Sequence, residues 1–330
     1  MREFGYERVF DVSGAVALLG TDPEARFLGG GTNLVDLMKA GVERPALLVD
    51  VRELPLDTVE FAPDSGLRIG ATVTNSDLAA HAEVRRHYPA LAQALLAGAS
   101  GQLRNMATVG GNLLQRTRCG YFSDLAKPCN KRVPGSGCPA IAGEHHNHAI
   151  LGASEHCVAT HPSDMAVALA AFDAVVSYET ADGPGELPVA EFYLPVGDTP
   201  HIETALPPGA LVTGITLPPA AVAAHSRYRK VRERASYAFA VGSIAAALDV
   251  QDGVVRDVRL AFGAVASRPW RARAAERALT GGPASAEAYA AAADAELAAA
   301  RTLPENGYKV TLMRNLVVAV LTELAEEAAR

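Results

Sequence analysis

Two glycine-rich turns, at residues 29–31 and 110–111, constrain the fold of this chain more than any other feature of its sequence. The first turn lies between a strand-like segment and a helical segment in which Leu34, Leu37 and Met38 share one apolar face. Consecutive glycines leave the backbone N–H groups unobstructed and permit positive φ, so the amides can point into one concavity. Such a concavity at the positive end of a helix suits a pyrophosphate, and a plain strand-to-helix connection is the competing interpretation.

The second turn, residues 108–112 (TVGGN), carries a hydroxyl before its glycines and a side-chain amide after them. Thr32 and Asn33 add side-chain donors to the first turn. The first turn fits neither a mononucleotide nor a Rossmann fingerprint, because no Gly-Lys-Ser/Thr follows it and Leu34 stands where the Rossmann pattern needs glycine. Two separated anion-ready turns suit a long dinucleotide whose diphosphate lies between two loops, so the sequence favours phosphate binding.

All four cysteines fall within 39 residues of a segment, 117–157, that is rich in Gly, Pro, Asn and His and lacks periodicity. They are Cys119, Cys129, Cys138 and Cys157. A loop of this length inside a compact domain indicates either function or disorder.

Several explanations of the cysteine cluster compete. Disulfides are disfavoured, because the N-terminal segment shows no secretion-signal pattern. A structural zinc site usually has a Cys-x₂₋₄-Cys pair, which is absent, although four nearby histidines keep a mixed Cys/His site open. These histidines are His145, His146, His148 and His156. An iron–sulfur cluster accepts four thiolates, but spacings of 9, 8 and 18 residues match no short ferredoxin-type run, so cluster, zinc and inert thiols all stay open.

The length of 330 residues favours two domains, with a boundary near residue 220 after the Pro- and Gly-rich segment 181–219. In the first domain we predict a strand at 67–73, followed by a helix whose N-terminus is capped by Ser76 or Asn75. We predict a second helix at 89–99. The stretch 103–115 (LRNMATVGGNLLQ) is strand-like apart from its glycines.

The second domain is expected to be a small antiparallel sheet with helices. Strands around 241–250 and 254–262 are joined across Asp252-Gly253, which is a strong turn signal. Two helices should follow, one of them the alanine-rich segment 284–301.

Charge and hydropathy exclude some partners. The net charge of −7 is spread along the chain without a long basic run, so neither nucleic acid nor an anionic membrane surface is expected to bind. No apolar stretch approaches the roughly 20 residues that span a bilayer. We therefore expect a cytoplasmic protein, or a periplasmic one if a signal-bearing partner exports it.

Three charged residues have two interpretations each. Asp164, after Pro162 and Ser163, is either a helix cap or a carboxylate that accepts from a ligand. Lys230 is either a solvated charge or a cation that stabilises an anionic reduced flavin, and Arg256 is equally ambiguous.

Five motifs occur in an order that resembles the FAD-binding medium subunit of the xanthine dehydrogenase/carbon monoxide dehydrogenase family. They are FLGGGTNLVDLMK, NMATVGGNLLQ, HPSDMAVALAAFDA, KVRERASYAFAVGSIAAALD and VRLAFGAVASRPWRA, and they cover nearly the whole chain. The cysteine segment resembles an insertion in flavin subunits of molybdenum aldehyde oxidoreductases, and more distantly of 4-hydroxybenzoyl-CoA reductase. In that group the insertion carries a 4Fe–4S cluster. Positions 145–147 depart from the pattern, since they read His-His-Asn where Asn-Arg-like residues are expected.

The resemblance implies an α+β fold: a two-part FAD-binding domain of the vanillyl-alcohol oxidase (PCMH) type over 1–220, with the insertion at 117–157. A smaller α/β C-terminal flavoprotein domain would occupy 225–330. It also implies a set of FAD-binding residues: Arg26, Phe27, Leu28, Gly29, Gly30, Gly31, Thr32, Asn33, Leu34, Thr108, Gly110, Gly111, Asn112, Asp164, Val212 and Lys230. The four cysteines would hold the cluster, and no catalytic residue is implied.

By the same resemblance the chain is an electron-transfer subunit. A large partner with molybdenum cofactor would oxidise an aldehyde or heteroaromatic substrate, and a small partner with two 2Fe–2S clusters would pass electrons to the FAD. An external acceptor would then oxidise the flavin. A stand-alone FAD oxidoreductase and a zinc-binding interaction module are the alternatives.

Overall fold

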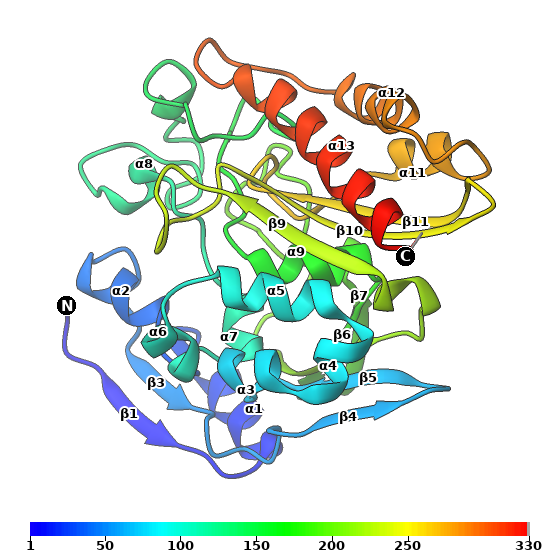
Figure 1. The fold of residues 1–330 in the computed structure, drawn as a ribbon. Coiled ribbons are helices and arrows are strands. Elements are labelled where there is room, and N and C mark those ends of the chain that lie inside the picture. Colours follow the sequence, from blue (N-terminus) through cyan, green and yellow to red (C-terminus); the bar gives the residue numbers. More distant parts are fainter. Residues whose placement is uncertain (329–330) are drawn as a thin grey trace.

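The computed structural model describes residues 1–328 and shows an α+β fold in two parts (Figure 1). The N-terminal part begins with a small parallel sheet in the order β1-β3-β2. Its elements are β1 (Gly5–Arg8), α1 (Val12–Thr21), β2 (Ala25–Leu28), α2 (Leu34–Lys39) and β3 (Leu47–Asp50). The predicted strand, glycine turn and helix of the first motif are therefore confirmed as β2, residues 29–33 and α2.

A five-stranded antiparallel sheet in the order β4-β5-β8-β6-β7 completes this part. Its strands are β4 (Val59–Ala62), β5 (Gly66–Gly70), β6 (Val175–Thr180), β7 (Gly183–Pro188) and β8 (Leu211–Leu217), with α10 (Val189–Phe192) after β7. Strand β8 lies between β5 and β6 in the sheet, so the sheet is complete only when the chain has reached residue 217. Two helices, α5 (Pro89–Ala97) and α9 (Asp164–Ala171), join the sheet's buried face in one apolar core.

Short helices fill the rest of this part, and some differ from our predictions. They are α3 (Asn75–Ala80), α4 (Ala82–His87), α6 (Gly101–Met106) and α7 (Val109–Leu113). The predicted strand character of 103–115 is wrong, because Ser100 caps α6 and Thr108 caps α7 through their side-chain oxygens. Thr74, and not Ser76 or Asn75, caps α3.

The C-terminal part is an antiparallel sheet in the order β12-β11-β10-β9 covered by three helices (Figure 1). Its elements are η2 (Ala221–Ala224), β9 (Ser226–Val231), β10 (Gly242–Gln251), β11 (Val254–Gly263), β12 (Trp270–Arg271), α11 (Arg273–Leu279), α12 (Ala286–Leu297) and α13 (Tyr308–Ala328). The turn between β10 and β11 is confirmed, with Asp252 and Gly253 both at positive φ. We predicted two helices after the hairpin, whereas the structure has three.

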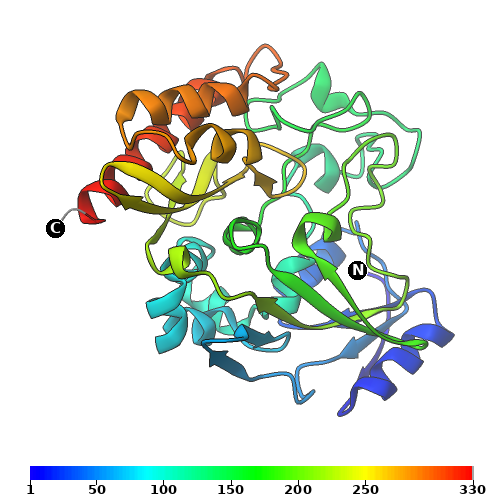
Figure 2. The same ribbon diagram turned by 90° about the vertical axis from the view of Figure 1, so that its right-hand side faces the viewer.

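The cysteine segment 117–157 contacts both parts and contains only two short helices, α8 (Gly120–Ser123) and η1 (Pro139–Ile141). Lys131 ties it to the N-terminal part through a 2.6 Å ion pair with Glu203. Its later half lies beside the start of α13 (Figure 2), where Lys309 donates to the carbonyl of Asn147 over 3.0 Å. No helix within 1–328 has both the length and the apolar composition needed to cross a bilayer.

Candidate functional site

A cavity of about 230 Å³ lies between the N-terminal and C-terminal parts, and six of the predicted FAD-binding residues line it. They come from the first glycine turn, the second glycine turn, the start of α9 and strand β9: Thr32, Asn33, Gly111, Asn112, Asp164 and Lys230. Residues separated by up to 198 positions in the chain thus face one space, as a binding site requires.

The two glycine turns are packed directly against each other. A Cβ atom on Gly30 would stand 1.7 Å from the carbonyl oxygen of Met106, and one on Gly29 would stand 2.7 Å from the Thr108 hydroxyl. Gly31 has a φ of +72°, which favours glycine. The glycines therefore let the two turns touch, a role that the sequence did not reveal.

The first turn presents unused hydrogen-bond donors. Within residues 1–328, none of the five amides from residue 29 to residue 33 donates to a backbone carbonyl. The Asn33 Oδ1 accepts from the amide of Arg116 over 2.8 Å, while its Nδ2 is buried without a partner in the described structure. Because buried donors are costly to leave unpaired, this group of N–H donors fits an anionic ligand such as a diphosphate.

The second turn differs from our expectation. Its amides at 109–112 are all bonded inside the protein, to Val73, Ala71 and the hydroxyl and carbonyl oxygens of Thr108. The prediction of a second anion-ready turn is therefore wrong for the backbone. This turn offers instead the Asn112 side chain, whose Oδ1 accepts from Ser163 over 2.6 Å and so leaves its NH₂ group for other partners.

We predict that Thr108→Val weakens the site modestly. Valine keeps the shape of threonine but removes the oxygen that accepts from the Gly111 amide over 3.2 Å. Losing a helix cap costs about 1 kcal/mol, which corresponds to a few-fold increase in the Kd for FAD if the cost falls on the bound form. Flavin titration by fluorescence quenching measures the change, and Thr72→Val serves as the control, because the Thr72 hydroxyl has no partner in residues 1–328. Equal Kd values for the two variants contradict the prediction.

Opposite the turns, a buried ion pair joins the two parts of the chain. The Lys230 Nζ lies 2.7 Å from Asp164 Oδ2, and the Tyr228 hydroxyl donates to Asp164 Oδ1 over 2.5 Å. Burial raises the pKa of Asp164, against the opposing effects of Lys230 and Tyr228. The cap interpretation of Asp164 is wrong, since Ser163 caps α9. Sequence reasoning missed Tyr228, which has no recognisable motif.

The remaining predicted residues lie behind the cavity or away from it. Arg26, Phe27 and Leu28 form strand β2, which delivers the chain into the first turn. Val212 is buried in the core on β8 and does not line the cavity. Arg256 is exposed on β11 and does not line it either.

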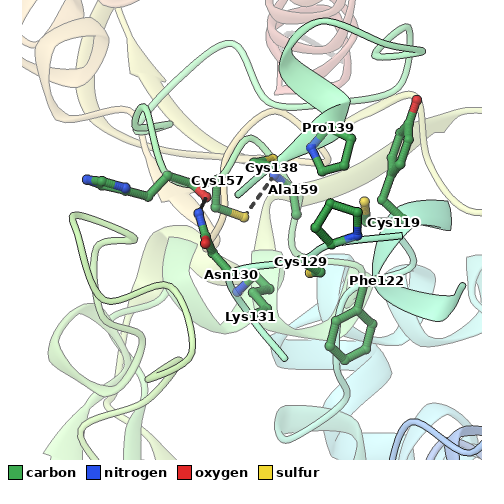
Figure 3. Close-up of a pocket in the computed structure, with 12 residues that line it drawn as sticks. Cys119, Phe122, Cys129, Asn130, Lys131, Cys138, Pro139, Cys157 and Ala159 are labelled. Carbon is green, nitrogen blue, oxygen red and sulfur yellow. Dashed lines mark hydrogen bonds between the residues drawn. The ribbon is translucent and has the colours of Figure 1, made fainter. Parts of the chain in front are cut away.

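The four cysteines also converge, on a second and smaller cavity (Figure 3). Cys119 and Cys129 lie on the side of Phe122, and Cys157 lies opposite them. The neighbouring Cys157 thiol lowers the pKa of Cys138 to about 6, while Cys138 and burial together raise the pKa of Cys157. Burial raises the pKa of Cys119.

The donor set of the smaller cavity consists of thiols. Within residues 1–328, no three His, Cys, Asp or Glu side chains are gathered closely enough for a single metal ion. Four thiols around one cavity, walled by Tyr121, Phe122 and two prolines, are the donors that a 4Fe–4S cluster uses. The space between them is about 10 Å³, so a bound cluster would replace the Cys138–Cys157 contact.

Sequence reasoning also missed Arg118. It precedes Cys119 and lines the larger cavity, where its guanidinium stands 4.9 Å from the centre of the Phe239 ring. Burial lowers its pKa. The candidate flavin cavity and the cysteine cavity are therefore adjacent along the chain and in space.

Two family descriptions match almost the entire chain. Residues 2–220 match the FAD binding domain in molybdopterin dehydrogenase, and residues 214–324 match the CO dehydrogenase flavoprotein C-terminal domain. The aldehyde oxidoreductase FAD-binding subunit PaoB of Escherichia coli K12 is 51% identical over 99% of this chain and 100% of its own length. The chain belongs to the FAD-binding subunits of the molybdopterin dehydrogenases.

A further relative agrees in sequence, and two solved structures agree in fold. The glyceraldehyde dehydrogenase medium chain of Sulfolobus acidocaldarius is 25% identical over 84% of this chain and 82% of its own. Among solved structures, carbon monoxide dehydrogenase of Hydrogenophaga pseudoflava aligns with a TM-score of 0.75 and 26% identity over 97% of this chain and 96% of that one. Quinoline 2-oxidoreductase of Pseudomonas putida 86 shares the fold, with a TM-score of 0.76 over 100% of this chain and 99% of its own at 22% identity. The predicted two-domain FAD-binding fold is thereby confirmed.

Proposed function

We propose that this chain is the FAD- and 4Fe–4S-carrying electron-transfer subunit of a molybdenum-containing aldehyde oxidoreductase. The observation that carries the proposal is the pairing of two adjacent cavities, one with free amide donors and one with four thiols. The aldehyde substrate class follows the aldehyde oxidoreductase subunit that shares 51% of its residues with this chain.

The larger cavity would hold the FAD. The amides of residues 29–33 and the Asn33 NH₂ group would bind the diphosphate, with Asn112 on the facing turn. When bound, the flavin exchanges electrons singly or in pairs, so it links one-electron donors to a two-electron acceptor. Lys230 would supply a positive charge on the far side of the cavity, and Asp164 with Tyr228 would hold that charge in place.

The four cysteines would bind the 4Fe–4S cluster as thiolates. Cys119, Cys129 and Cys138 lie in turns or helix caps, and a bound cluster would fix their positions. Cys157 is buried beside Ala159. The adjacency of Arg118 and Cys119 would place the cluster beside the flavin cavity.

The partners would be a large subunit with molybdenum cofactor and a small subunit with 2Fe–2S clusters. Relatives described as a FAD-binding subunit or a medium chain support this arrangement, because these terms belong to multi-subunit enzymes. The small subunit would deliver electrons to the FAD, and an external acceptor would remove them.

Cofactor analysis of the full chain tests the proposal. Purified without oxygen, it should contain one FAD, four iron atoms and four sulfides, and affinity capture from its host should retain both partner subunits. A chain that carries flavin but elutes alone would favour a stand-alone FAD oxidoreductase. Zinc without flavin absorbance would contradict the proposal.

We predict that Cys129→Ser removes the cluster while the flavin stays. Serine is a poor substitute for a thiolate ligand, and three thiolates leave one iron without its protein ligand. Iron and sulfide per chain should fall to a small fraction of the wild-type values, with unchanged flavin content. Val133→Ser is the control, since its exposed side chain lies in the same segment but outside the cavity. Full iron content in Cys129→Ser would remove this cysteine from the ligand set.

A further inference from the structure

His148 contacts the first of the four cysteines without belonging to the proposed ligand set. Its Nε2 lies 3.2 Å from the Sγ of Cys119. The ring lies near Tyr121, with 6.4 Å between the ring centroids. Among the hydrogen bonds of residues 1–328, no other side-chain nitrogen reaches a cysteine sulfur. This contact therefore singles out Cys119 among the four thiols.

The surroundings of the imidazole decide which nitrogen carries the proton. A neutral imidazole has one N–H group and one bare nitrogen. Nδ1 of His148 is buried and has no partner in the described structure. A proton on Nδ1 would leave a buried donor unpaired, at a cost of about 1–3 kcal/mol, whereas a proton on Nε2 points at the sulfur. A Cys119 bound to the proposed cluster would be a thiolate, which only accepts, so Nε2–H would donate to it.

The backbone around His148 is held by the C-terminal part. The Asn306 Nδ2 donates to the carbonyls of His148 and Ala149 over 3.5 and 3.1 Å. Lys309 donates to the carbonyl of Asn147 over 3.0 Å. Asn306 and Lys309 both have 0% exposure, so the two side chains that hold this backbone belong to the buried core and not to the surface.

We propose that His148 is a positioning residue that donates a hydrogen bond to the Cys119 sulfur and thereby raises the reduction potential of the bound cluster. The inference rests on the proposed 4Fe–4S function. One-electron reduction adds negative charge to the cluster and its thiolates, and a donor aimed at a thiolate stabilises that charge. The C-terminal part thus tunes the cluster through the segment that it anchors.

The test compares reduction potentials in the anaerobically purified full chain. The cluster is titrated with dithionite, and the reduced form is followed by electron paramagnetic resonance. We expect His148→Phe to shift the reduction equilibrium against the reduced cluster about tenfold, which is ~59 mV for a one-electron couple. His148→Gln keeps an N–H donor and should remain within about a third of that shift. His225→Phe is the control, because His225 is exposed, lies outside the cysteine cavity and its ring bonds to no sulfur.

Each outcome decides between a hydrogen bond and mere packing. Equal potentials for wild type and His148→Phe overturn the inference while leaving the cluster proposal intact. If His148→Phe loses iron and His148→Gln keeps it, the donor is required and the inference stands. If both variants lose iron, His148 acts through packing and the inference fails. A wild-type chain without iron overturns the cluster proposal, and the inference with it.

Discussion

Gly30→Ala should abolish flavin binding. The added Cβ would stand 1.7 Å from the carbonyl oxygen and 2.4 Å from the carbonyl carbon of Met106. Both atoms belong to the backbone, so no side-chain rotation relieves the clash, and the turns at 29–33 and 108–112 must separate. Overpacking of this kind costs about 3 kcal/mol or more, which in binding terms exceeds a hundredfold in Kd.

The measurement is flavin absorbance per purified chain, accompanied by thermal unfolding. Gly20→Ala is the matched control, since a Cβ at Gly20 meets nothing within 4 Å and the residue lies in helix α1. Alanine there should leave flavin content unchanged and stabilise the helix by about 0.5–1 kcal/mol. Stoichiometric flavin in Gly30→Ala would show that the close approach of the two turns is not needed for binding.

Lys230→Met should destabilise the chain by about 3–5 kcal/mol, because it leaves a buried carboxylate without its cation. Asp164 and Lys230 are both at most 9% exposed, so solvent screens their interaction weakly. Arg229→Met is the matched control on the same strand: Arg229 pairs with Glu323 but is 38% exposed, and a surface pair contributes about 0–1 kcal/mol. Chemical denaturation of both variants measures the difference.

The defect of Lys230→Met should depend on pH. Burial already raises the pKa of Asp164, and loss of Lys230 removes an opposing effect, so this pKa rises further. An acid whose pKa is raised by folding binds its proton more tightly in the folded state, so stability grows as pH falls toward the unfolded pKa. The variant should therefore lie closer to wild type at pH 5 than at pH 8. A defect of equal size at both pH values would show that Asp164 does not cause it.

Local patterns in the sequence predicted the parts of the fold that local physics decides. The first glycine turn sits between β2 and α2 because an apolar helix face follows three glycines, and the β10–β11 turn forms because Asp-Gly accepts positive φ. In contrast, the strand assignment of 103–115 failed, since two side-chain caps outweighed its apolar character. Pattern reasoning also merged the C-terminal helices into two, although three are formed.

The site itself depended on contacts that no local pattern encodes. The glycines at 29 and 30 serve the approach of a segment almost eighty residues away, and Tyr228 reaches Asp164 only because two parts of the chain pack together. Arg118 belongs to no sequence motif, and only the structure shows that it lines the larger cavity. Cysteine spacing alone left iron–sulfur, zinc and inert thiols open, and it could not show that the four thiols line one cavity.

The anchoring of the cysteine segment by Asn306 and Lys309 has a consequence for biosynthesis. A ribosome makes all four cysteines about 150 residues before it makes these two anchors, since synthesis runs from the N-terminus. Until then the carbonyls of Asn147 and Ala149 lack the donors that Lys309 and Asn306 supply. The nascent chain consequently carries all four cysteines throughout the translation of its second half, and the segment that holds them is fully anchored only at the close of elongation.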